Sequence, residues 1–338
     1  MIRAHMTEPI YPLLFTPVYK DYIWGGQRLP AKYGRKNTPG VCAESWEISA
    51  HSDGMSVVAN GTCAGIPLAA LTQRLGVALL GSHAAGSRQF PLLFKLIDAR
   101  QHLSVQVHPA DDNAGLVGGE AKTEMWYVVD REPGSVLYAG LKPGVTPEMF
   151  RAAMSHGTVP DFLYRLDVTP GEALFIPGGL VHAIGAGCFF YEVQQSSNTT
   201  YRLYDWGRFD AAGQPRPLHL HQAFQVINPD LPVPRMIPPP APLTDKNNRW
   251  SEVLACPHFH LRRLDLFQGE DIRTHGESFH ALFVAEGSVT VSANGVQTAI
   301  PNCASALVPA GALTFRIEPT TSSATVLVTT LGHKSQGF

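Results

Sequence analysis

The chain has 338 residues, of which 44% are hydrophobic and only 16% are charged. This composition excludes a disordered protein, and the length is sufficient for two domains with sizeable cores. The formal net charge of −2 gives no reason to expect nucleic acid or an anionic membrane as a partner. No apolar run reaches the length of a membrane span.

Two features bear on where the protein works. Residues 1–6 lack the apolar core of a signal peptide, and Met6 is an alternative start that would make residues 1–5 an addition. The five cysteines, at positions 42, 63, 188, 256 and 303, are odd in number and never form a C-x-x-C pair. Scattered cysteines of this kind predict reduced thiols and a cytoplasmic protein.

The first third of the chain predicts short strands and one helix. Residues 11–65 are expected to form short strands joined by turns, and residues 44–49 alternate as in an ordinary half-buried strand. Residues 66–80 have the spacing of an amphipathic helix with a proline near its start. Residues 90–99 form a strongly apolar run, which predicts a core strand.

The next segment, residues 101–110, alternates with the period of a β-strand. Its apolar residues fall on one face, and Ser104, Gln106 and His108 fall on the other. Pro109 ends the strand because it cannot donate to a ladder. A Gln and a His two residues apart are more often an exposed polar face than a ligand pair. Because this segment follows a core strand, however, we expect its polar face to line an interior cleft.

A second strand with a polar face is predicted shortly afterwards, where Lys122, Glu124 and Trp126 share one side. Glu124, together with Gln106 and His108, offers a carboxylate, an amide oxygen and an imidazole. These are metal ligands of the kind that suits zinc.

The middle of the chain combines helices with further strands. A helix is predicted over residues 146–154, with Thr146 as its N-cap, Pro147 in its first position and Gly157 just after its end. We expect strands at residues 162–168, 171–182 and 189–194, and another helix at residues 217–228.

A proline-rich run at residues 229–242 is the best domain boundary, because such segments form stiff linkers. The expected division is a first domain over residues 1–232 and a second, all-β domain over residues 233–338. The tetrapeptide V-P-A-G in the second domain weakly repeats I-P-G-G in the first, which suggests two related β-sandwiches. The second copy has no histidine at the corresponding spacing, so we expect no metal in that domain.

The strongest spacing in the sequence is G-x5-P-x-G-x2-H over residues 171–182, a tight turn followed by a strand on which His182 points inward. This pattern resembles the second motif of the cupin jelly roll, and Gln106-x-His108 with Glu124 stands in place of the first motif. The predicted fold is therefore mainly β, with two cupin-type jelly-roll sandwiches and a few short helices.

Four motifs in the right order resemble the type I mannose-6-phosphate isomerases in their short bacterial form. They are S-V-Q-V-H-P, K-T-E-M-W-Y, P-G-G-L-V-H-A-I-G, and Glu192 followed by Y-R-L-Y-D-W. The resemblance runs from about residue 22 to residue 227. The second domain resembles the family only in its general type and shares none of these motifs. The resemblance implies one zinc ion per chain, with the ligands Gln106, His108, Glu124 and His182. Their single anionic ligand leaves a net positive charge that can polarise a sugar carbonyl or stabilise an enediolate.

The resemblance also implies roles for five other residues. The active-site arginine of the family falls on Arg202, its nearby carboxylate on Glu192, and a further catalytic side chain on Lys122. Ser104 and Lys95 match positions that the family uses near the phosphate. From the sequence alone, Glu192 could instead lie on a surface strand, and the stem of Lys95 could simply cover apolar surface.

The implied function is the interconversion of mannose 6-phosphate and fructose 6-phosphate through an enediol. Zinc with Lys122 would act as the electrophile, and Arg202 would stabilise the enediolate or hold the substrate. The base stays open between Glu192, Lys122 and a zinc-bound hydroxide. One alternative is an iron-dependent cupin oxygenase, against which Gln106 argues. Another is a sugar-binding cupin without turnover, against which the retained catalytic residues argue.

Two further histidine pairs rank low as ligands. His219 and His221 are expected on a helix, where residues two apart point away from each other. His258 and His260 lie in the second domain without other ligands, so they are expected to be structural or exposed. The sequence does not set the oligomeric state.

Overall fold

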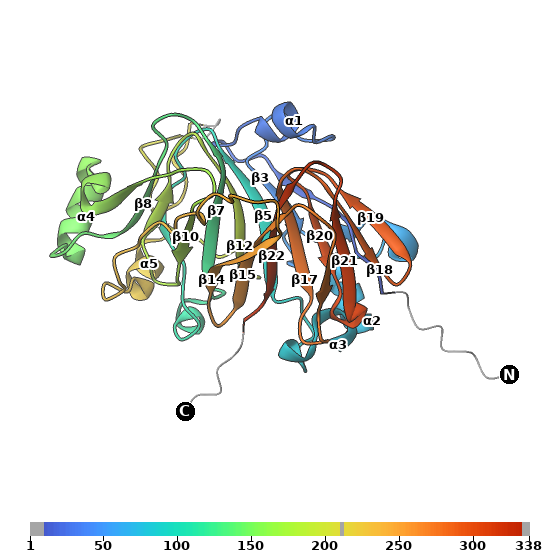
Figure 1. Ribbon diagram of the computed structural model, residues 1–338. Coiled ribbons are helices and arrows are strands. Elements are labelled where there is room, and N and C mark those ends of the chain that lie inside the picture. Colours follow the sequence, from blue (N-terminus) through green and yellow to red (C-terminus); the bar gives the residue numbers. More distant parts are fainter. Residues whose placement is uncertain (1–9, 210–212, 333–338) are drawn as a thin grey trace. The chain divides into compact units, whose positions relative to one another are not determined.

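The computed structural model describes residues 10–209 and 213–332 (Figure 1). Strands predominate and the helices are short, which confirms the mainly β fold. The chain forms two compact units, each drawn from separate stretches of sequence. Unit 1 consists of the described residues within 1–18, 47–91 and 240–338, and unit 2 consists of those within 19–46 and 92–239. The predictions about residues 1–6 lie outside the described residues.

Unit 2 is built on two sheets whose described pairings are antiparallel. The first sheet has the order β10 (Ala173–Ile176), β7 (Glu124–Arg131), β12 (Cys188–Gln195), β5 (Leu92–Ala99), β3 (Glu44–Ile48) and β2 (Val18–Lys20). The second has the order β13 (Tyr201–Tyr204), β6 (Val105–Val107), β11 (His182–Ile184), β8 (Val136–Leu141) and β9 (Leu163–Asp167). Trp126 and Leu174 of the first sheet share one buried cluster with Leu137 and Ile184 of the second. The sheets are therefore the layers of a β-sandwich, as expected for a cupin fold.

Successive side chains of β6 lie in two different environments. Val105 and Val107 belong to a second buried cluster that also contains residues of α4 (Pro147–His156) and α5 (Leu220–Val226). Gln106 has the opposite parity and lines a cavity within unit 2. The predicted division into an apolar face and a polar interior face is therefore confirmed within β6, which is only three residues long. It does not hold for Leu103, which lines the same cavity as Gln106.

Helix α4 has the N-cap, the first helical residue and the terminating glycine that the sequence predicted, and it runs two residues beyond the predicted residue 154. The Thr146 hydroxyl accepts a hydrogen bond from the Met149 amide at 3.3 Å, and Pro147 is the first helical residue. Gly157 follows the helix with φ of 72°, the left-handed conformation that glycine adopts without strain. The boundary is set locally, which explains why it could be predicted.

Replacing Thr146 with alanine is expected to lower the free energy of unfolding by about 1 kcal/mol, because an N-cap hydroxyl satisfies one helix-terminal amide. Urea denaturation of Thr146→Ala and of the matched variant Thr146→Ser measures this effect. The serine variant should stay close to the wild type. Equal losses in both variants would show that the hydroxyl does not act as a cap.

Two predicted helices differ from those observed. The helix expected over residues 66–80 is divided into α2 (Leu68–Leu75) and α3 (Val77–Leu80), because Gly76 adopts φ of 50° and ψ of −120° between them. The helix expected over residues 217–228 is shorter and is only α5. A further helix, α1 (Arg28–Tyr33), was not predicted.

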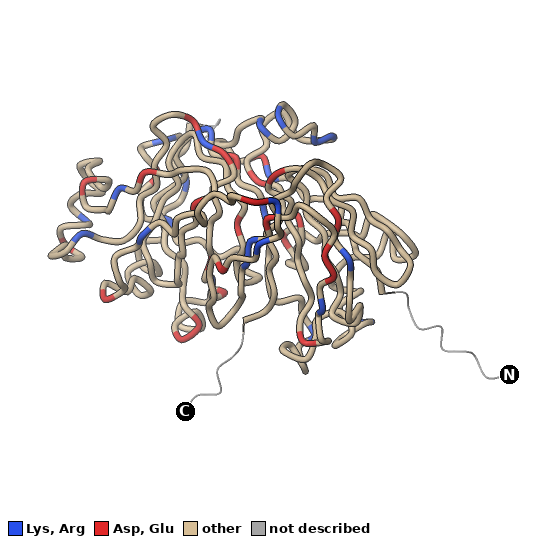
Figure 2. Tube along the Cα trace, in the orientation of Figure 1, with Lys and Arg blue, Asp and Glu red and all other residues tan. Residues whose placement is uncertain are grey.

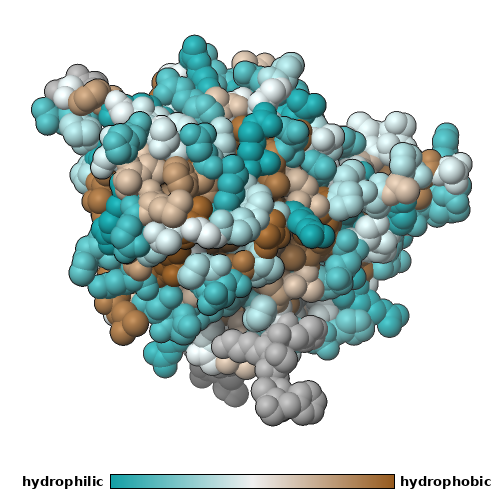
Figure 3. All heavy atoms as spheres, turned by 90° about the vertical axis from the view of Figure 1, so that its left-hand side faces the viewer, coloured by the Kyte–Doolittle hydropathy of each residue, from teal (hydrophilic) through white to brown (hydrophobic). Residues whose placement is uncertain are grey.

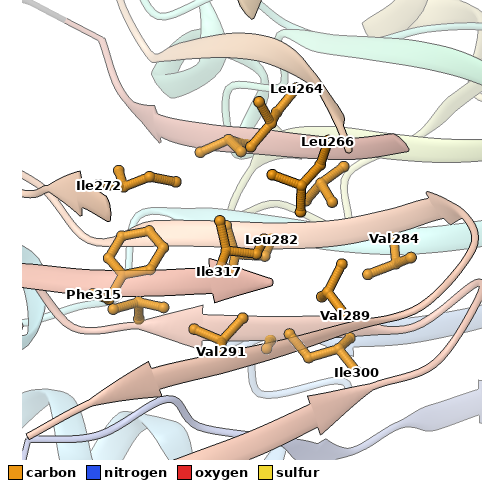
Figure 4. Packing of buried hydrophobic residues seen from close by; sticks show 14 of the residues in the cluster. Leu264, Leu266, Ile272, Leu282, Val284, Val289, Val291, Ile300, Phe315 and Ile317 are labelled. Carbon is orange, nitrogen blue, oxygen red and sulfur yellow. The ribbon is translucent and has the colours of Figure 1, made fainter. Parts of the chain in front are cut away.

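Unit 1 contains a second sandwich. One sheet has the order β14 (Arg249–Ala255), β15 (Phe259–Leu266), β22 (Ala324–Leu331), β17 (His280–Glu286) and β20 (Ser305–Val308). The other has the order β16 (Glu270–Arg273), β21 (Thr314–Pro319), β18 (Val289–Ala293) and β19 (Val296–Ile300), and β1 (Phe15–Thr16) pairs with β4 (Val57–Val58) separately. Figure 4 shows Leu264 and Leu282 of the first sheet packed with Val291 and Phe315 of the second. The second sandwich is therefore held by a continuous apolar core.

The proline-rich segment is more than a linker. Ile237 pairs with Ala173 through two backbone hydrogen bonds of 2.7 and 3.0 Å, and Leu231 and Met236 pack on the core of unit 2. The compact unit extends to residue 239, and unit 1 also takes in residues 47–91. The division at residue 232 therefore does not describe the packing, and it remains a prediction about independently folding domains.

Charged residues of both signs are interleaved along the chain (Figure 2). On the face that carries α4, hydrophilic side chains alternate with apolar ones (Figure 3). None of the described helices is long and apolar enough to cross a membrane.

Candidate active site

Three buried side chains form a compact cluster inside unit 2. His108 follows β6, Glu124 begins β7 and His182 begins β11. Their ligand atoms all lie within 4.8 Å of one another, and Glu124 Oε1 is 3.7 Å from His108 Nε2 and 3.4 Å from His182 Nε2. Within residues 10–209 and 213–332, this is the one group of three His, Cys, Asp or Glu side chains placed to hold a metal ion.

The turn before His182 explains how two distant histidines meet. The Gly179 amide donates to the His108 carbonyl at 2.8 Å, which fastens the turn to the end of β6. A Cβ on Gly178 would lie 2.6 Å from the Ala110 Cα, so only glycine permits this approach. Gly179 itself has φ of 90°. The G-x5-P-x-G spacing therefore positions the His182 side chain through backbone contacts.

Both histidines present the same ring nitrogen to the cluster. His108 Nδ1 lies 2.8 Å from the Thr199 carbonyl, and His182 Nδ1 lies 2.8 Å from the Leu180 carbonyl. A carbonyl only accepts, so each Nδ1 carries the proton and each Nε2 offers its lone pair towards Glu124.

The protonation states also suit a metal site. Burial lowers the pKa of His108 well below its usual value, and the positive charge of Lys122 lowers it further. Burial likewise lowers the pKa of His182, although Glu124 opposes that shift. Neutral imidazoles are the form that binds metal.

Unsatisfied polar atoms indicate that the cluster fits a cation. Glu124 Oε1 is buried and accepts no hydrogen bond from the described residues, which is rare unless an ion satisfies it. Gln106 lies directly beside His182 across the sheet, with its Nε2 3.4 Å from His182 Nε2. Its Oε1 accepts from Ser104 Oγ at 3.2 Å. Rotating the amide by 180° exchanges these two ends, so Gln106 can equally direct its oxygen at the cluster. Two imidazoles, a carboxylate and an amide oxygen fit zinc.

Lys122 is the nearest basic side chain to the cluster. Its Nζ lies 2.6 Å from Glu124 Oε2 and 3.1 Å from His108 Nε2. Glu124 therefore contacts Lys122 through one oxygen and faces the two histidines with the other.

The cluster lies next to a cavity of about 260 Å³ in unit 2. Six of the residues predicted for the site line it, namely Lys95, Ser104, Gln106, Lys122, Glu192 and Arg202. Six polar or aromatic residues that the sequence analysis missed also line it, namely Tyr22, Trp24, Glu44, Asn198, Thr200 and Arg216. The structure thus brings every predicted site residue to one place.

Lys95 lies between two carboxylates rather than covering apolar surface. Its Nζ is 2.8 Å from Glu192 Oε2 and 3.6 Å from Glu44 Oε2. Trp126 Nε1 donates to Glu192 Oε1 at 2.8 Å, and Trp46 Nε1 donates to Glu44 Oε2 at 2.7 Å. Burial lowers the pKa of Lys95 to about 8, against the raising effect of Glu44. The surface-strand alternative for Glu192 is wrong, because it is only 2% exposed.

Replacing Lys95 with glutamine is expected to lower the free energy of unfolding by about 3 kcal/mol, because two buried carboxylates lose their cation. Urea denaturation measures this. Lys32→Gln is the matched control, since Lys32 pairs with Asp130 at 2.8 Å on the surface and should contribute less than about 1 kcal/mol. Similar losses in both variants would contradict the buried network.

The prediction that residues 44–49 form a half-buried strand is wrong about the burial. All five residues of β3 are buried, so both faces of the strand are covered and Glu44 points into the site region. The alternation of polar and apolar residues suggested an outer face, but here the polar residues face a polar interior.

The two low-ranked histidines at the start of α5 do not form a ligand pair. His219 Nδ1 instead accepts from the Arg202 amide at 3.2 Å, and His221 contacts Gln225.

The fold and the cluster together define a metal-binding protein of the cupin type. The family described as phosphomannose isomerase type I, catalytic domain, matches residues 13–137. The chain is 42% identical over 224 residues to the mannose-6-phosphate isomerase ManA of Bacillus subtilis, covering 65% of this chain and 70% of that one. It is 40% identical over 225 residues to the mannose-6-phosphate isomerase of Streptococcus mutans, covering 66% and 68%. The chain therefore belongs to the type I mannose-6-phosphate isomerase family.

Solved structures extend the likeness to nearly the whole chain. The crystal structure of the mannose 6-phosphate isomerase from Bacillus subtilis matches with a TM-score of 0.81 at 28% identity, covering 94% of this chain and 99% of that one. A zinc-bound mannose 6-phosphate isomerase shares the fold with a TM-score of 0.72 at 16% identity, covering 96% and 100%. The fold likeness thus includes the C-terminal part, which the sequence matched only in kind.

Proposed function

We propose that this chain is a zinc-dependent aldose–ketose isomerase that interconverts mannose 6-phosphate and fructose 6-phosphate through an enediol. The observation that carries the proposal is the buried His108, Glu124 and His182 cluster beside a cavity with basic side chains. Membership of the isomerase family supplies the substrate and the reaction.

One zinc ion per chain would be held by His108, His182, Glu124 and the amide oxygen of Gln106. When bound, it supplies a positive charge that polarises the sugar carbonyl. The zinc-bound relative has the same fold, and the donor set here has the neutral imidazoles and the anionic carboxylate that zinc prefers. With its oxygen directed at the zinc, Gln106 would donate from Nε2 to Ser104 Oγ, which would orient the amide.

The charges around the cavity suit a sugar phosphate. Its lining carries four basic side chains, Lys95, Lys122, Arg202 and Arg216, and two acidic ones, Glu44 and Glu192. The excess of positive charge matches a phosphate dianion. The roles of Lys95 and Ser104 near the phosphate remain predictions, and both side chains also hold neighbouring site residues.

Contacts in the structure support our proposals for the remaining catalytic roles. Arg202 on β13 pairs in register with Gln106, so its side chain is beside the metal ligands and can stabilise the enediolate. Burial lowers the pKa of Arg202, but a guanidinium stays charged at any working pH. Both oxygens of Glu192 contact Trp126 or Lys95, so Glu192 suits a positioning role better than that of the base. Lys122 lies closest to the ligands and is the group that we assign to proton transfer at the reacting carbons.

We also place the activity in the cytoplasm. All five cysteines are free, and four of them are buried, which fits a reducing compartment.

A coupled assay that follows fructose 6-phosphate formed from mannose 6-phosphate tests the proposal, together with zinc analysis and oxygen uptake on the same sample. We expect isomerisation, bound zinc and no oxygen consumption. Oxygen uptake with bound iron would support the oxygenase alternative. Sugar phosphate binding without product would support a cupin that only binds.

A further inference from the structure

A second charged cluster lies beside the same cavity. It consists of Asp205, from the Y-R-L-Y-D-W motif, and of Arg208 and Arg216, which no motif includes. Asp205 is mostly buried and accepts hydrogen bonds from both Arg208 and Arg216. Burial alone would raise the pKa of Asp205, but the hydrogen bonds from Arg216 and Arg208 outweigh it and lower the pKa. Asp205 is therefore a carboxylate that holds two guanidinium groups.

The two arginines are placed differently. Arg208 Nη1 donates to the His102 carbonyl at 2.6 Å, so Arg208 is fixed against the backbone and does not line the cavity. Arg216 binds Asp205 with two of its nitrogens, Nε to Oδ2 at 2.7 Å and Nη2 to Oδ1. The hydrogen bonds of the Arg216 side chain to described residues use Nε and Nη2 and leave Nη1 without a partner among those residues. Arg216 lines the cavity. Arg216 thus presents an unused donor group from a fixed position.

The segment that carries Arg216 is fastened to strand β13. Arg202 Nη1 donates to the Pro217 carbonyl at 2.7 Å. The His219 amide donates to the Arg202 carbonyl at 2.8 Å, and His219 Nδ1 accepts from the Arg202 amide at 3.2 Å. Arg216 is therefore held near Arg202, which is itself beside the metal ligands.

The local charges are unbalanced. Among the described residues, Asp205 is the one carboxylate that acts on Arg202, whereas Arg208 and Arg216 add positive charge, so the three guanidinium groups exceed this carboxylate by two charges. The pKa of Arg202 is lowered by burial and by the positive charge of Arg216. Such repulsion is unfavourable unless an anion is bound, and an excess of two charges matches a phosphate dianion.

We propose that Arg216, clamped by Asp205, binds the phosphate group of the substrate. The inference rests on the proposed function and assigns that site a specificity residue from outside the recognised motifs. Arg202 would act at the reacting carbons, whereas Arg216 would act at the phosphate end. Lys95 is less suited to this role, because it is already paired with Glu44 and Glu192. Asp205 is a positioning residue, since it acts through Arg216.

Steady-state kinetics of Arg216→Ala test the assignment. KM for mannose 6-phosphate should rise about 10- to 100-fold, the effect of losing a hydrogen bond to a charged group, while kcat changes by less than about threefold. Competitive inhibition by inorganic phosphate should weaken to a similar extent. Asp205→Asn should raise KM by a smaller factor without lowering kcat, because Arg216 stays charged but is less firmly held.

Arg165→Ala is the matched control. It removes one arginine whose Nη1 pairs with Asp167 at 3.0 Å on an exposed part of unit 2, so KM should be unchanged. Thermal unfolding confirms that each variant is folded, and Arg216→Lys provides a second variant, which should recover part of the affinity.

An unchanged KM and unchanged phosphate inhibition in Arg216→Ala would overturn the inference. So would loss of phosphate affinity in Lys95→Gln but not in Arg216→Ala. Calorimetric titration with inorganic phosphate alone separates this result from a failure of the proposed function. A wild-type protein that binds phosphate through Arg216 but forms no fructose 6-phosphate would contradict only the isomerase assignment.

Discussion

Replacing His182 with alanine is expected to remove the bound zinc and to lower turnover of mannose 6-phosphate at least about a thousandfold. His182 is fully buried, and its Nε2 faces Glu124 beside Gln106. A four-ligand site rarely keeps its metal after losing an imidazole, and a metal that polarises a carbonyl contributes several kcal/mol to transition-state stabilisation. His108→Ala should behave in the same way. Zinc analysis and the coupled assay measure both effects.

His221→Ala is the matched control for the loss of a histidine. His221 is exposed on α5 and contacts Gln225, so zinc content and turnover should both match those of the wild type. A metal-free His182→Ala protein with full activity would end the zinc-isomerase account.

Replacing Arg202 with alanine is expected to lower kcat by a factor of roughly a hundred to a thousand, the usual effect of removing one preorganised donor. KM should change much less, because an interaction made mainly in the transition state does not hold the ground state. The substitution removes the hydrogen bond from Arg202 Nη1 to the Pro217 carbonyl, but the two hydrogen bonds between the Arg202 backbone and His219 survive, so the segment that carries Arg216 should stay in place. Steady-state kinetics measure kcat and KM separately.

Zinc content should be unchanged in Arg202→Ala, which distinguishes it from the ligand variants. If KM rises steeply while kcat holds, Arg202 binds the phosphate and its assigned role is wrong. The expected contrast is a loss of kcat in Arg202→Ala and a rise of KM in Arg216→Ala. Similar changes in both variants would show that the two arginines act as one group.

Local patterns predicted the metal cluster and the residues around it. The alternation along β6 placed Gln106 on the interior face because strand side chains alternate strictly. The glycine and proline spacing before His182 indicated a turn whose backbone lies so close to Ala110 that only glycine fits at position 178. The cap residues of α4 likewise act within one helical turn. In each case the determining contacts lie close in sequence or follow a fixed period.

Features that depend on contacts between residues far apart in the sequence could not be predicted from local patterns. Glu44 enters the site because β3 is covered on both faces, whereas its sequence reads as half-buried. Arg216 is held at the cavity by its hydrogen bonds to Asp205 and by the hydrogen bond from Arg202 to the Pro217 carbonyl. It lies outside the sequence motifs. The compact units differ from the expected division for the same reason, since residues 47–91 pack with the C-terminal part of the chain. The division at residue 232 stays a prediction about independently folding domains.

The most direct test is to strip the metal from the wild-type protein with a chelator and to follow the isomerisation of mannose 6-phosphate as zinc is added back. The account predicts that the metal-free protein is inactive, and that activity rises in proportion to added zinc and levels off at one zinc ion per chain. Full turnover by the metal-free protein, or activity that does not respond to zinc, would contradict it.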